Sequence, residues 1–378
     1  MKQRNAWFIL LAGVASCAGA MVACGSDNNN QTSSGSDTSS SSSSNSSASS
    51  TSSASSTSST SSTSSSSTSS SSTSTGGTTG DAVPYYDMTG KGFGIQGQVT
   101  GTPAPGYTAT WGGGIPKQYV YESKIAGGLV GFDAIFPPSY DTSPDKRYPV
   151  IYHLHGKGEN HTAYRYNGAL DAKLPMFWSS GTGEFIFISI GGRNDCWWSD
   201  GNDGDKAESH IIQEVLSVVD QQFRTLGVRE GRGIMGFSMG GFGSHKIAIK
   251  YPQYFAVGAT YCGGTYSAGK YVFSTNEEGF GFGSDFDRIW GTNAEYDSRD
   301  CGRSLLSSKA PEIKQRGTGF VIHAGTSDMF FNHNKGFKAQ LDGLGVSAIY
   351  TEAAHGHDMG AVTGQFFNNI LSFMATAK

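Results

Sequence analysis

The chain has 378 residues, of which 15% are charged, and its 27 basic and 31 acidic residues give a formal net charge of −4. No basic run or stripe of basic and aromatic residues stands out, so the sequence gives no electrostatic support for nucleic-acid binding. The 53 glycines and the 12% of aromatic residues indicate many loops around an aromatic-rich surface.

Residues 1–23 have the pattern of a lipoprotein signal peptide. Lys2 and Arg4 form a basic region, an apolar stretch begins at Trp7, and small residues lead up to Cys24. The apolar stretch is too short and too interrupted for a membrane-spanning helix.

The residues before Cys24 resemble the lipobox of bacterial lipoproteins, in which the cysteine is acylated and becomes the mature N-terminus. Cys17 is an alternative acceptor, and an ordinary cleaved signal peptide is a second alternative. We expect an exported protein that a lipid on Cys24 anchors in a bacterial cell envelope, at the outer membrane or the cell surface.

Residues 24–80 form a predicted disordered linker, because a run composed almost entirely of Ser and Thr cannot bury enough apolar surface to offset its chain entropy. Globular composition begins near Tyr85, and we assign residues 81–378 to one folded domain. About 300 residues are enough for one large domain with a well-buried core.

Apolar runs and helical patterns alternate along this domain. The predicted strands lie within 148–156, 185–190, 233–237, 256–262, 320–325 and 348–353, and the predicted helices at 207–226, 239–250, 334–344 and 361–375. Residues 85–130 are expected to form early strands or a small cap. The alternation predicts an α/β fold with a mostly parallel sheet flanked by helices on both faces.

Ser238 is the candidate nucleophile. It lies at the centre of the G-x-S-x-G motif Gly236–Gly240, where an apolar strand gives way to a helix. A sharp turn at this point would expose the serine hydroxyl at the carboxyl edge of the sheet. The first amide of the following helix, that of Met239, is the predicted donor to an oxyanion.

A serine that transfers acyl groups needs a base and an acid that orients the base. In folds of this kind they follow the serine in the order acid and then histidine, each in a loop after a strand. Asp328 and His357 occupy these positions, and Asp358 and His355 are their respective competitors.

The second oxyanion donor is expected in the loop after the His155-Gly156 pair. We assign it to the backbone N–H of Lys157, with Gly158 as the alternative. His153 and His155 alternate along a strand without a further spaced set of ligands, so the sequence predicts no catalytic metal.

Four segments together resemble the feruloyl esterase and acetyl xylan esterase group, the esterase D-like branch of the α/β-hydrolases. They are PPSYD…KRYPVIYHLHGKGEN, GFSMGG, HAGTSD and GHD, spread over roughly residues 130–375. The resemblance implies the α/β-hydrolase fold, Ser238, Asp328 and His357 as a catalytic triad, and carboxylic-ester substrates without a cofactor. The sequence departs from the group's pattern at Lys157 and at Met359.

The expected function is hydrolysis of feruloyl or acetyl esters of plant polysaccharide through an acyl-enzyme. The alternatives are an acyltransferase or a siderophore or lipid esterase of the same fold, and a non-catalytic surface module that binds carbohydrate.

Two further features bear on the site. The adjacent Trp197 and Trp198 follow a strand and could stack on a sugar or phenolic ring, although core packing would also account for them. Three cysteines remain after export, namely Cys196, Cys262 and Cys301, and we expect one disulfide, with a slight preference for Cys262–Cys301.

Overall fold

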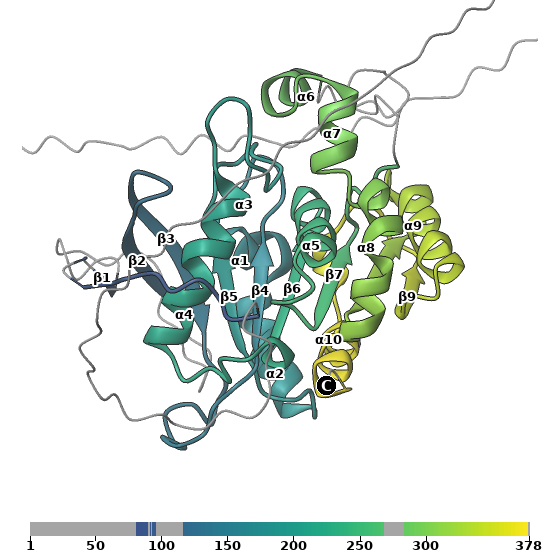
Figure 1. The fold of residues 1–378 in the computed structure, drawn as a ribbon. Helices are drawn as coiled ribbons and strands as arrows, with labels where there is room; N and C mark the ends of the chain where they lie inside the picture. Colours follow the sequence, from purple (N-terminus) through teal and green to yellow (C-terminus); the bar gives the residue numbers. More distant parts are fainter. Residues whose placement is uncertain (1–80, 90, 92, 96–115, 268–282, 377–378) are drawn as a thin grey trace, which may run out of the picture. The chain divides into compact units, whose positions relative to one another are not determined.

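A computed structural model describes residues 81–89, 91, 93–95, 116–267 and 283–376 (Figure 1). The predicted signal peptide, with Cys17 and Cys24, and the predicted linker lie outside these residues. None of the helices in the described ranges has both the length and the apolar character needed to cross a bilayer.

The described residues form a sheet with the strand order β1-β2-β3-β5-β4-β6-β7-β8-β9. Its strands are β1 (Phe93–Ile95), β2 (Lys117–Ser123), β3 (Gly128–Ile135), β4 (Val150–Leu154), β5 (Ile186–Ile190), β6 (Arg232–Phe237), β7 (Val257–Tyr261), β8 (Gly319–Gly325) and β9 (Ala348–Ala353). In this spatial order, every pair of neighbours in the part β5-β4-β6-β7-β8-β9 is parallel. The strands β1, β2 and β3 add an antiparallel edge next to β5.

Helices cover both faces of this sheet. They are α1 (Ala163–Gly168), α2 (Leu170–Ser179), α3 (Ala207–His210), α4 (Leu216–Gln222), α5 (Met239–Lys250), α6 (Gly283–Ile289), α7 (Asn293–Arg299), α8 (Gly302–Arg316), α9 (Phe331–Gly343) and α10 (Gly364–Thr376). A π-helical turn at Ile211–Val215 joins α3 to α4.

Alternation along the strands separates two hydrophobic layers. Ile186, Ile188 and Ile190 of β5 pack in the layer that α4, α5, α8 and α9 cover. Phe187 points the other way, into the layer beneath α2 and α10. Each central strand is therefore buried on both faces, which accounts for its nearly continuous apolar sequence.

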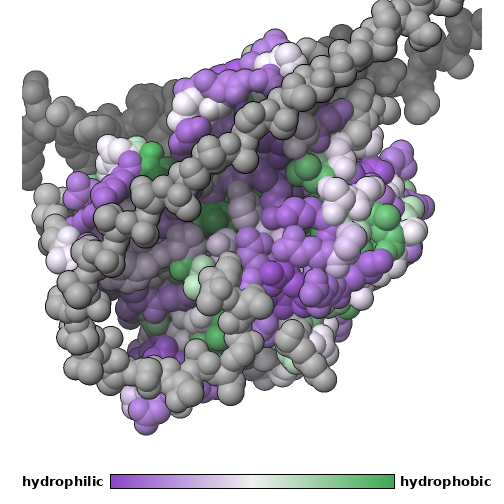
Figure 2. All heavy atoms as spheres, viewed as in Figure 1, coloured by the Kyte–Doolittle hydropathy of each residue, from purple (hydrophilic) through white to green (hydrophobic). Residues whose placement is uncertain are grey.

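The predicted strands and helices after residue 148 are present, and the residues before them form antiparallel strands rather than a separate cap. The face seen in Figure 2 is largely hydrophilic over the described residues, with hydrophobic side chains scattered singly. Apolar residues that lie singly are normal on a protein surface and mark no binding site. The strand-to-helix loops gather at the carboxyl edge of the sheet (Figure 1).

Candidate active site

Ser238 lies between β6 and α5 in a strained turn. Its φ of 56° and ψ of −118° are unusual for a residue with a side chain. The turn is held by its surroundings, since the Ser238 carbonyl accepts hydrogen bonds from the backbone N–H groups of Phe242 and Gly264. This geometry is that of a nucleophile elbow, in which the serine side chain leaves the end of the strand.

The flanking glycines permit close contacts of the backbone around the elbow. A Cβ at Gly236 would lie 2.1 Å from the carbonyl carbon of Gly240, and a Cβ at Gly240 would lie 1.9 Å from the carbonyl oxygen of Leu154. Such distances leave no room for a side chain. The motif residues are thus required by the packing of α5 against β6 and the end of β4.

Asp328 and His357 lie together. The His357 Nδ1 atom is 3.1 Å from Oδ2 and 3.2 Å from Oδ1 of Asp328. The His357 ring packs on Phe237, the residue before Ser238, with ring centroids 4.5 Å apart. The Asp328 side chain is fully buried, while that of His357 is 22% exposed, so the imidazole is the part of the pair that solvent reaches.

The Asp328 carboxylate is stabilised in its ionised form. Burial raises the pKa of Asp328, but hydrogen bonds from His357 and Cys262 and from the backbone N–H of Phe330, at 2.8 Å, outweigh burial and lower the pKa overall. A carboxylate held in this way can orient the imidazole through Nδ1 and stabilise its protonated form.

The competing residues are occupied elsewhere. The His355 Nε2 atom lies 2.8 Å from Nε2 of His323, and its Nδ1 lies 2.8 Å from the carbonyl oxygen of Gly356. Asp358 accepts the N–H of Gly360 at 2.6 Å and caps the short helical turn Met359–Ala361. The described contacts therefore favour His357 and Asp328 over these alternatives.

The loop after β4 borders the elbow. A Cβ at Gly156 would lie 3.4 Å from the Cβ of Ser238. The Gly158 N–H donates a 2.7 Å hydrogen bond to the carbonyl of Asn194, which argues against Gly158 as the second oxyanion donor. The Lys157 ammonium forms an ion pair with Asp285 of α6. The side chain is therefore engaged by Asp285, and the candidate oxyanion donor is the backbone N–H of Lys157.

Glu159 is a residue of this loop that the sequence reasoning missed. Its Oε2 accepts a 2.7 Å hydrogen bond from the Gly156 N–H, and its Oε1 accepts one from the Asn167 side chain. Burial raises the pKa of Glu159, although the Gly156 and Asn167 hydrogen bonds and the nearby His357 oppose the shift. An acidic residue three positions after the glycine of a Gly-rich loop was the signal available in the sequence.

The prediction of Trp197 and Trp198 as substrate-binding residues is wrong, and the alternative of core packing is confirmed. Their side chains are 1% and 0% exposed. Trp198 donates its indole N–H to the carbonyl of His155 at 3.1 Å, and Trp197 donates to Asp285 at 3.0 Å. Both indoles pack beneath the loops of the carboxyl edge, because the loop returns into the core after Cys196 instead of staying at the surface.

The preferred Cys262–Cys301 disulfide is also absent, since Cys196, Cys262 and Cys301 are buried free thiols. The Cys262 Sγ atom lies 4.0 Å from the carbonyl oxygen of Gly356, and the thiol is a neighbour of Asp328 that helps to lower the pKa of that carboxyl. Burial, reinforced by the charge of Asp328, raises the pKa of the Cys262 thiol. The thiol is thus a neutral neighbour of the acid candidate rather than a nucleophile.

Among the described residues, no group of three or more His, Cys, Asp or Glu side chains is arranged to hold a metal ion. A strained serine beside a His–carboxylate pair, at the carboxyl edge of a parallel sheet, is the arrangement of a serine hydrolase on an α/β-hydrolase scaffold.

The comparisons with known proteins agree with this class. Residues 123–362 match the family model described as "Putative esterase", and the chain belongs to this esterase family. The chain has the α/β-hydrolase fold, as its sequence predicted.

Two curated relatives match part of the chain. Esterase Rv1288 of Mycobacterium tuberculosis is 30% identical over 151 residues, which cover 38% of this chain and 31% of the relative. An endo-1,4-beta-xylanase/feruloyl esterase of Xylanibacter ruminicola is 28% identical over 181 residues, which cover 42% of this chain and 24% of the relative. The matched stretches thus span less than a third of the relatives' own lengths.

Solved structures share the fold. A ferulic acid esterase superimposes with a TM-score of 0.58 at 18% identity, covering 70% of this chain and 98% of that chain. A fluorophosphonate-binding serine hydrolase of Staphylococcus aureus gives a TM-score of 0.58 at 20% identity, covering 70% of this chain and 100% of that chain.

Proposed function

We propose that the protein is an exported serine esterase that cleaves feruloyl or acetyl esters of plant polysaccharide with Ser238, His357 and Asp328 as its triad. The observation that carries the proposal is the contact of His357 Nδ1 with both carboxylate oxygens of Asp328, next to the strained turn at Ser238.

The reaction has two steps. The Ser238 hydroxyl oxygen attacks the ester carbonyl while His357 takes its proton, and the same proton passes to the leaving alcohol as the C–O bond breaks. Water then attacks the acyl-enzyme with His357 again as the base, which releases the acid and regenerates the serine. The backbone N–H groups of Met239 and Lys157 would stabilise the oxyanion formed in each step.

The buried thiol and backbone donors around Asp328 support the assigned roles. They stabilise the carboxylate, so this residue stays ionised and can hold the imidazole in the tautomer whose Nε2 accepts a proton. Two observations support the substrate class, namely the feruloyl esterase activity in the name of the Xylanibacter ruminicola relative and the resemblance of the sequence motifs.

Turnover of two esters separates the chemistry from the substrate class. The wild type should hydrolyse p-nitrophenyl acetate and methyl ferulate, and Ser238→Ala should lose activity on both by a factor of about 10⁴ or more. Ser308→Ala, at an exposed position on α8, is the matched control and should retain wild-type rates. Equal, slow turnover by the wild type and Ser238→Ala would refute the esterase assignment, whereas turnover of the acetate alone would refute only the feruloyl substrate.

We also propose that a lipid on Cys24 anchors the protein in a bacterial cell envelope, which would place an enzyme of this kind outside the cytoplasm, where polysaccharide esters are accessible. Metabolic labelling with a clickable palmitate should mark the wild type and Cys17→Ser, and the label should be absent from Cys24→Ser. Label that persists in Cys24→Ser and is lost in Cys17→Ser would move the anchor to the earlier cysteine.

A further inference from the structure

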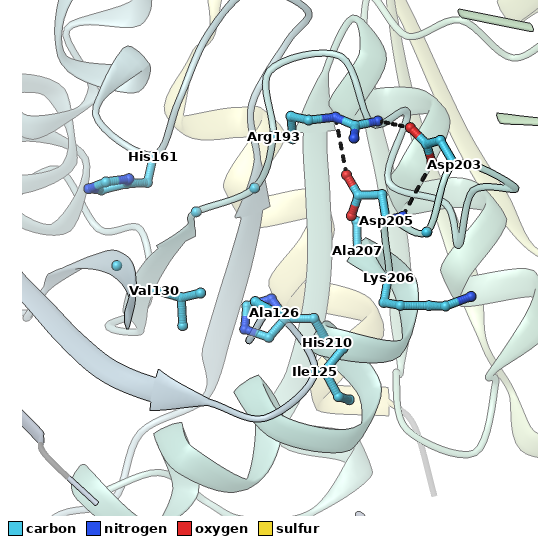
Figure 3. Close-up of a pocket in the computed structure, with 14 residues that line it drawn as sticks. Ile125, Ala126, Val130, His161, Arg193, Asp203, Asp205, Lys206, Ala207 and His210 are labelled. Carbon is cyan, nitrogen blue, oxygen red and sulfur yellow. Dashed lines mark hydrogen bonds and ion pairs between the residues drawn. The ribbon is translucent and has the colours of Figure 1, made fainter. Parts of the chain in front are cut away.

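A cavity of about 570 Å³ lies at the carboxyl end of β5 and is not used by the proposed reaction. Its walls come from the β2–β3 hairpin, the loop after β5 and the segment that leads into α3 (Figure 3). The volume is within the range of about 300–1,000 Å³ that is typical of small-molecule sites. None of its described lining residues is Ser238, Asp328 or His357.

The charges that line the cavity balance. Arg193 and Lys206 contribute two positive charges, and Asp203 and Asp205 contribute two negative charges. Arg193 contacts Asp203 at 2.5 Å and Asp205 at 3.3 Å, and Figure 3 shows its guanidinium held between the two carboxylates. A cavity without net charge gives no electrostatic preference for a phosphate, a carboxylate or a cation.

The two histidines of the cavity are neutral near pH 7. Burial lowers the pKa of His210 to about 4, and this imidazole is already engaged by the Tyr121 hydroxyl at 2.6 Å. Burial also lowers the pKa of His161. The histidines therefore leave the charge balance unchanged.

The chemistry of the walls fits a ligand with both hydroxyl and C–H surfaces. The fixed Arg193–carboxylate group presents polar atoms on one side of the cavity, and Ala126 and Val130 line the other side (Figure 3). None of the described lining residues is Phe, Tyr or Trp, and the only rings among them are the imidazoles of His161 and His210, so the cavity has no large aromatic ring on which an aromatic acyl group could stack. These features favour a sugar over a feruloyl group.

The cavity is also suitably placed relative to the nucleophile. Gly191 follows β5 and Ser238 follows β6, and β4 separates the two strands. Neighbouring strands are about 4.8 Å apart, so these two strand ends are roughly 10 Å apart. This separation corresponds to one or two sugar units between the ester bond and the cavity.

The loop after β5, which forms one wall of the cavity, is hydrogen-bonded to the loop after β4, which borders Ser238. The Gly158 N–H donates to the carbonyl of Asn194, and His155 Nε2 lies 3.3 Å from the carbonyl oxygen of Gly192. Gly191 has no space for a side chain, since a Cβ there would lie 2.2 Å from the carbonyl oxygen of Gly131. The position of the wall is thus fixed with respect to the candidate oxyanion loop.

We propose that this cavity binds an uncharged sugar unit of the alcohol part of the ester, while the acyl group occupies the space at Ser238. The proposal rests on the proposed function and adds to it a specific place for the polysaccharide.

A substitution that fills the cavity tests the proposal. Ala126→Trp would place a bulky side chain into the cavity, and Leu129→Trp on the same hairpin is the matched control, because Leu129 is 72% exposed and does not line the cavity. The two substrates are methyl ferulate and a feruloylated arabinoxylo-trisaccharide.

We expect Ala126→Trp to lower kcat/KM for the trisaccharide ester about tenfold, chiefly through KM, and to change methyl ferulate less than about twofold. Leu129→Trp should leave both substrates at wild-type values. Equal losses on both substrates, or no loss on either, would overturn the proposal.

Calorimetric titration with unesterified arabinoxylotriose provides a measurement that does not depend on turnover. The wild type and Leu129→Trp should bind the sugar, and Ala126→Trp should bind it about tenfold more weakly. No binding by the wild type, or equal binding by all three proteins, would overturn the sugar site. If neither ester is hydrolysed but the sugar binds as expected, the proposed function fails and the sugar site stands.

Discussion

The backbone N–H of Gly156 donates a 2.7 Å hydrogen bond to the carboxylate of Glu159, three residues further along the same loop. Gly156 in turn lies against Ser238, and the second carboxylate oxygen of Glu159 is bound by Asn167. The hydrogen bond between Gly156 and the Glu159 carboxylate therefore spans the loop segment that carries Lys157, the candidate oxyanion donor.

Loss of this bond should impair catalysis more than folding. Hydrogen bonds to charged groups contribute about 1.5–3 kcal/mol, so Glu159→Ala should lower kcat for p-nitrophenyl acetate by about 10- to 100-fold. Glu159→Gln keeps an oxygen that can accept the Gly156 N–H and should recover most of the loss. Steady-state kinetics with thermal melts of both variants are the measurement, and an alanine variant with wild-type kcat would show that the loop holds its shape without Glu159.

Close packing at Gly240 predicts a strong effect on stability. A Cβ there would lie 1.9 Å from the carbonyl oxygen of Leu154, and backbone atoms cannot move aside cheaply. Gly240→Ala should cost about 3 kcal/mol or more of unfolding free energy, or prevent folding. The control is Gly343→Ala at the end of α9, where a Cβ meets no atom within 4 Å, and urea titration should find it within about 1 kcal/mol of the wild type. Similar midpoints for the two variants would contradict the packing described at the elbow.

Buried neutral histidines predict a loss of stability in mild acid. Burial lowers the pKa of His153 to about 3 and those of His155, His210 and His245 to about 4. Between the ordinary value of 6.5 and these lowered values, the unfolded chain binds protons that the folded chain does not. The free energy of unfolding should therefore fall as the pH falls from about 6.5 to 4, by about 1.4 kcal/mol per pH unit for each histidine.

His210→Gln tests one of these contributions, because glutamine can still accept a hydrogen bond from Tyr121. Urea titrations at several pH values should give a slope that is smaller by about 1.4 kcal/mol per pH unit than in the wild type. An unchanged slope would mean that His210 is not buried as a neutral imidazole.

The three thiols of the described domain should be unreactive in the folded protein. Cys196, Cys262 and Cys301 are buried, and burial raises the pKa of Cys196 to about 12. Iodoacetamide should modify none of them before denaturation and all three in guanidinium without a reductant. Peptide mapping under non-reducing conditions is the measurement, and a Cys262–Cys301 peptide pair would restore the disulfide that the sequence suggested.

Much of the fold could be predicted from the sequence because its local signals agree with its packing. The strand Ala348–Ala353 and the helix Met239–Lys250 have the predicted bounds, since an apolar run and a glycine-flanked turn limit them. Helix α8 was missed because its 15 residues are mostly polar and include Pro311. Helix α2 likewise contains Pro175, and an internal proline argues against a helix when only local pattern is available.

The candidate site was only partly predictable. Ser238, Asp328 and His357 each follow a strand, and the topology of a parallel sheet alone gathers such positions at one edge. Local sequence does not determine how deeply a loop is buried, so the sequence left open whether Trp197 and Trp198 stack on a ligand or pack in the core, and the structure buries both. Cys262 neighbours Asp328 and has a positive φ of 50°, and no residue pattern in the chain indicates either feature.

Covalent labelling of the folded protein with a fluorophosphonate tests the central claim, that Ser238 is the nucleophile, most directly. Peptide mapping should find the phosphonyl group on Ser238 in the wild type and in Ser308→Ala, and no label in Ser238→Ala or in the denatured wild type, because only an activated serine reacts. Label on a different serine, or equal labelling of the wild type and Ser238→Ala, would contradict the account.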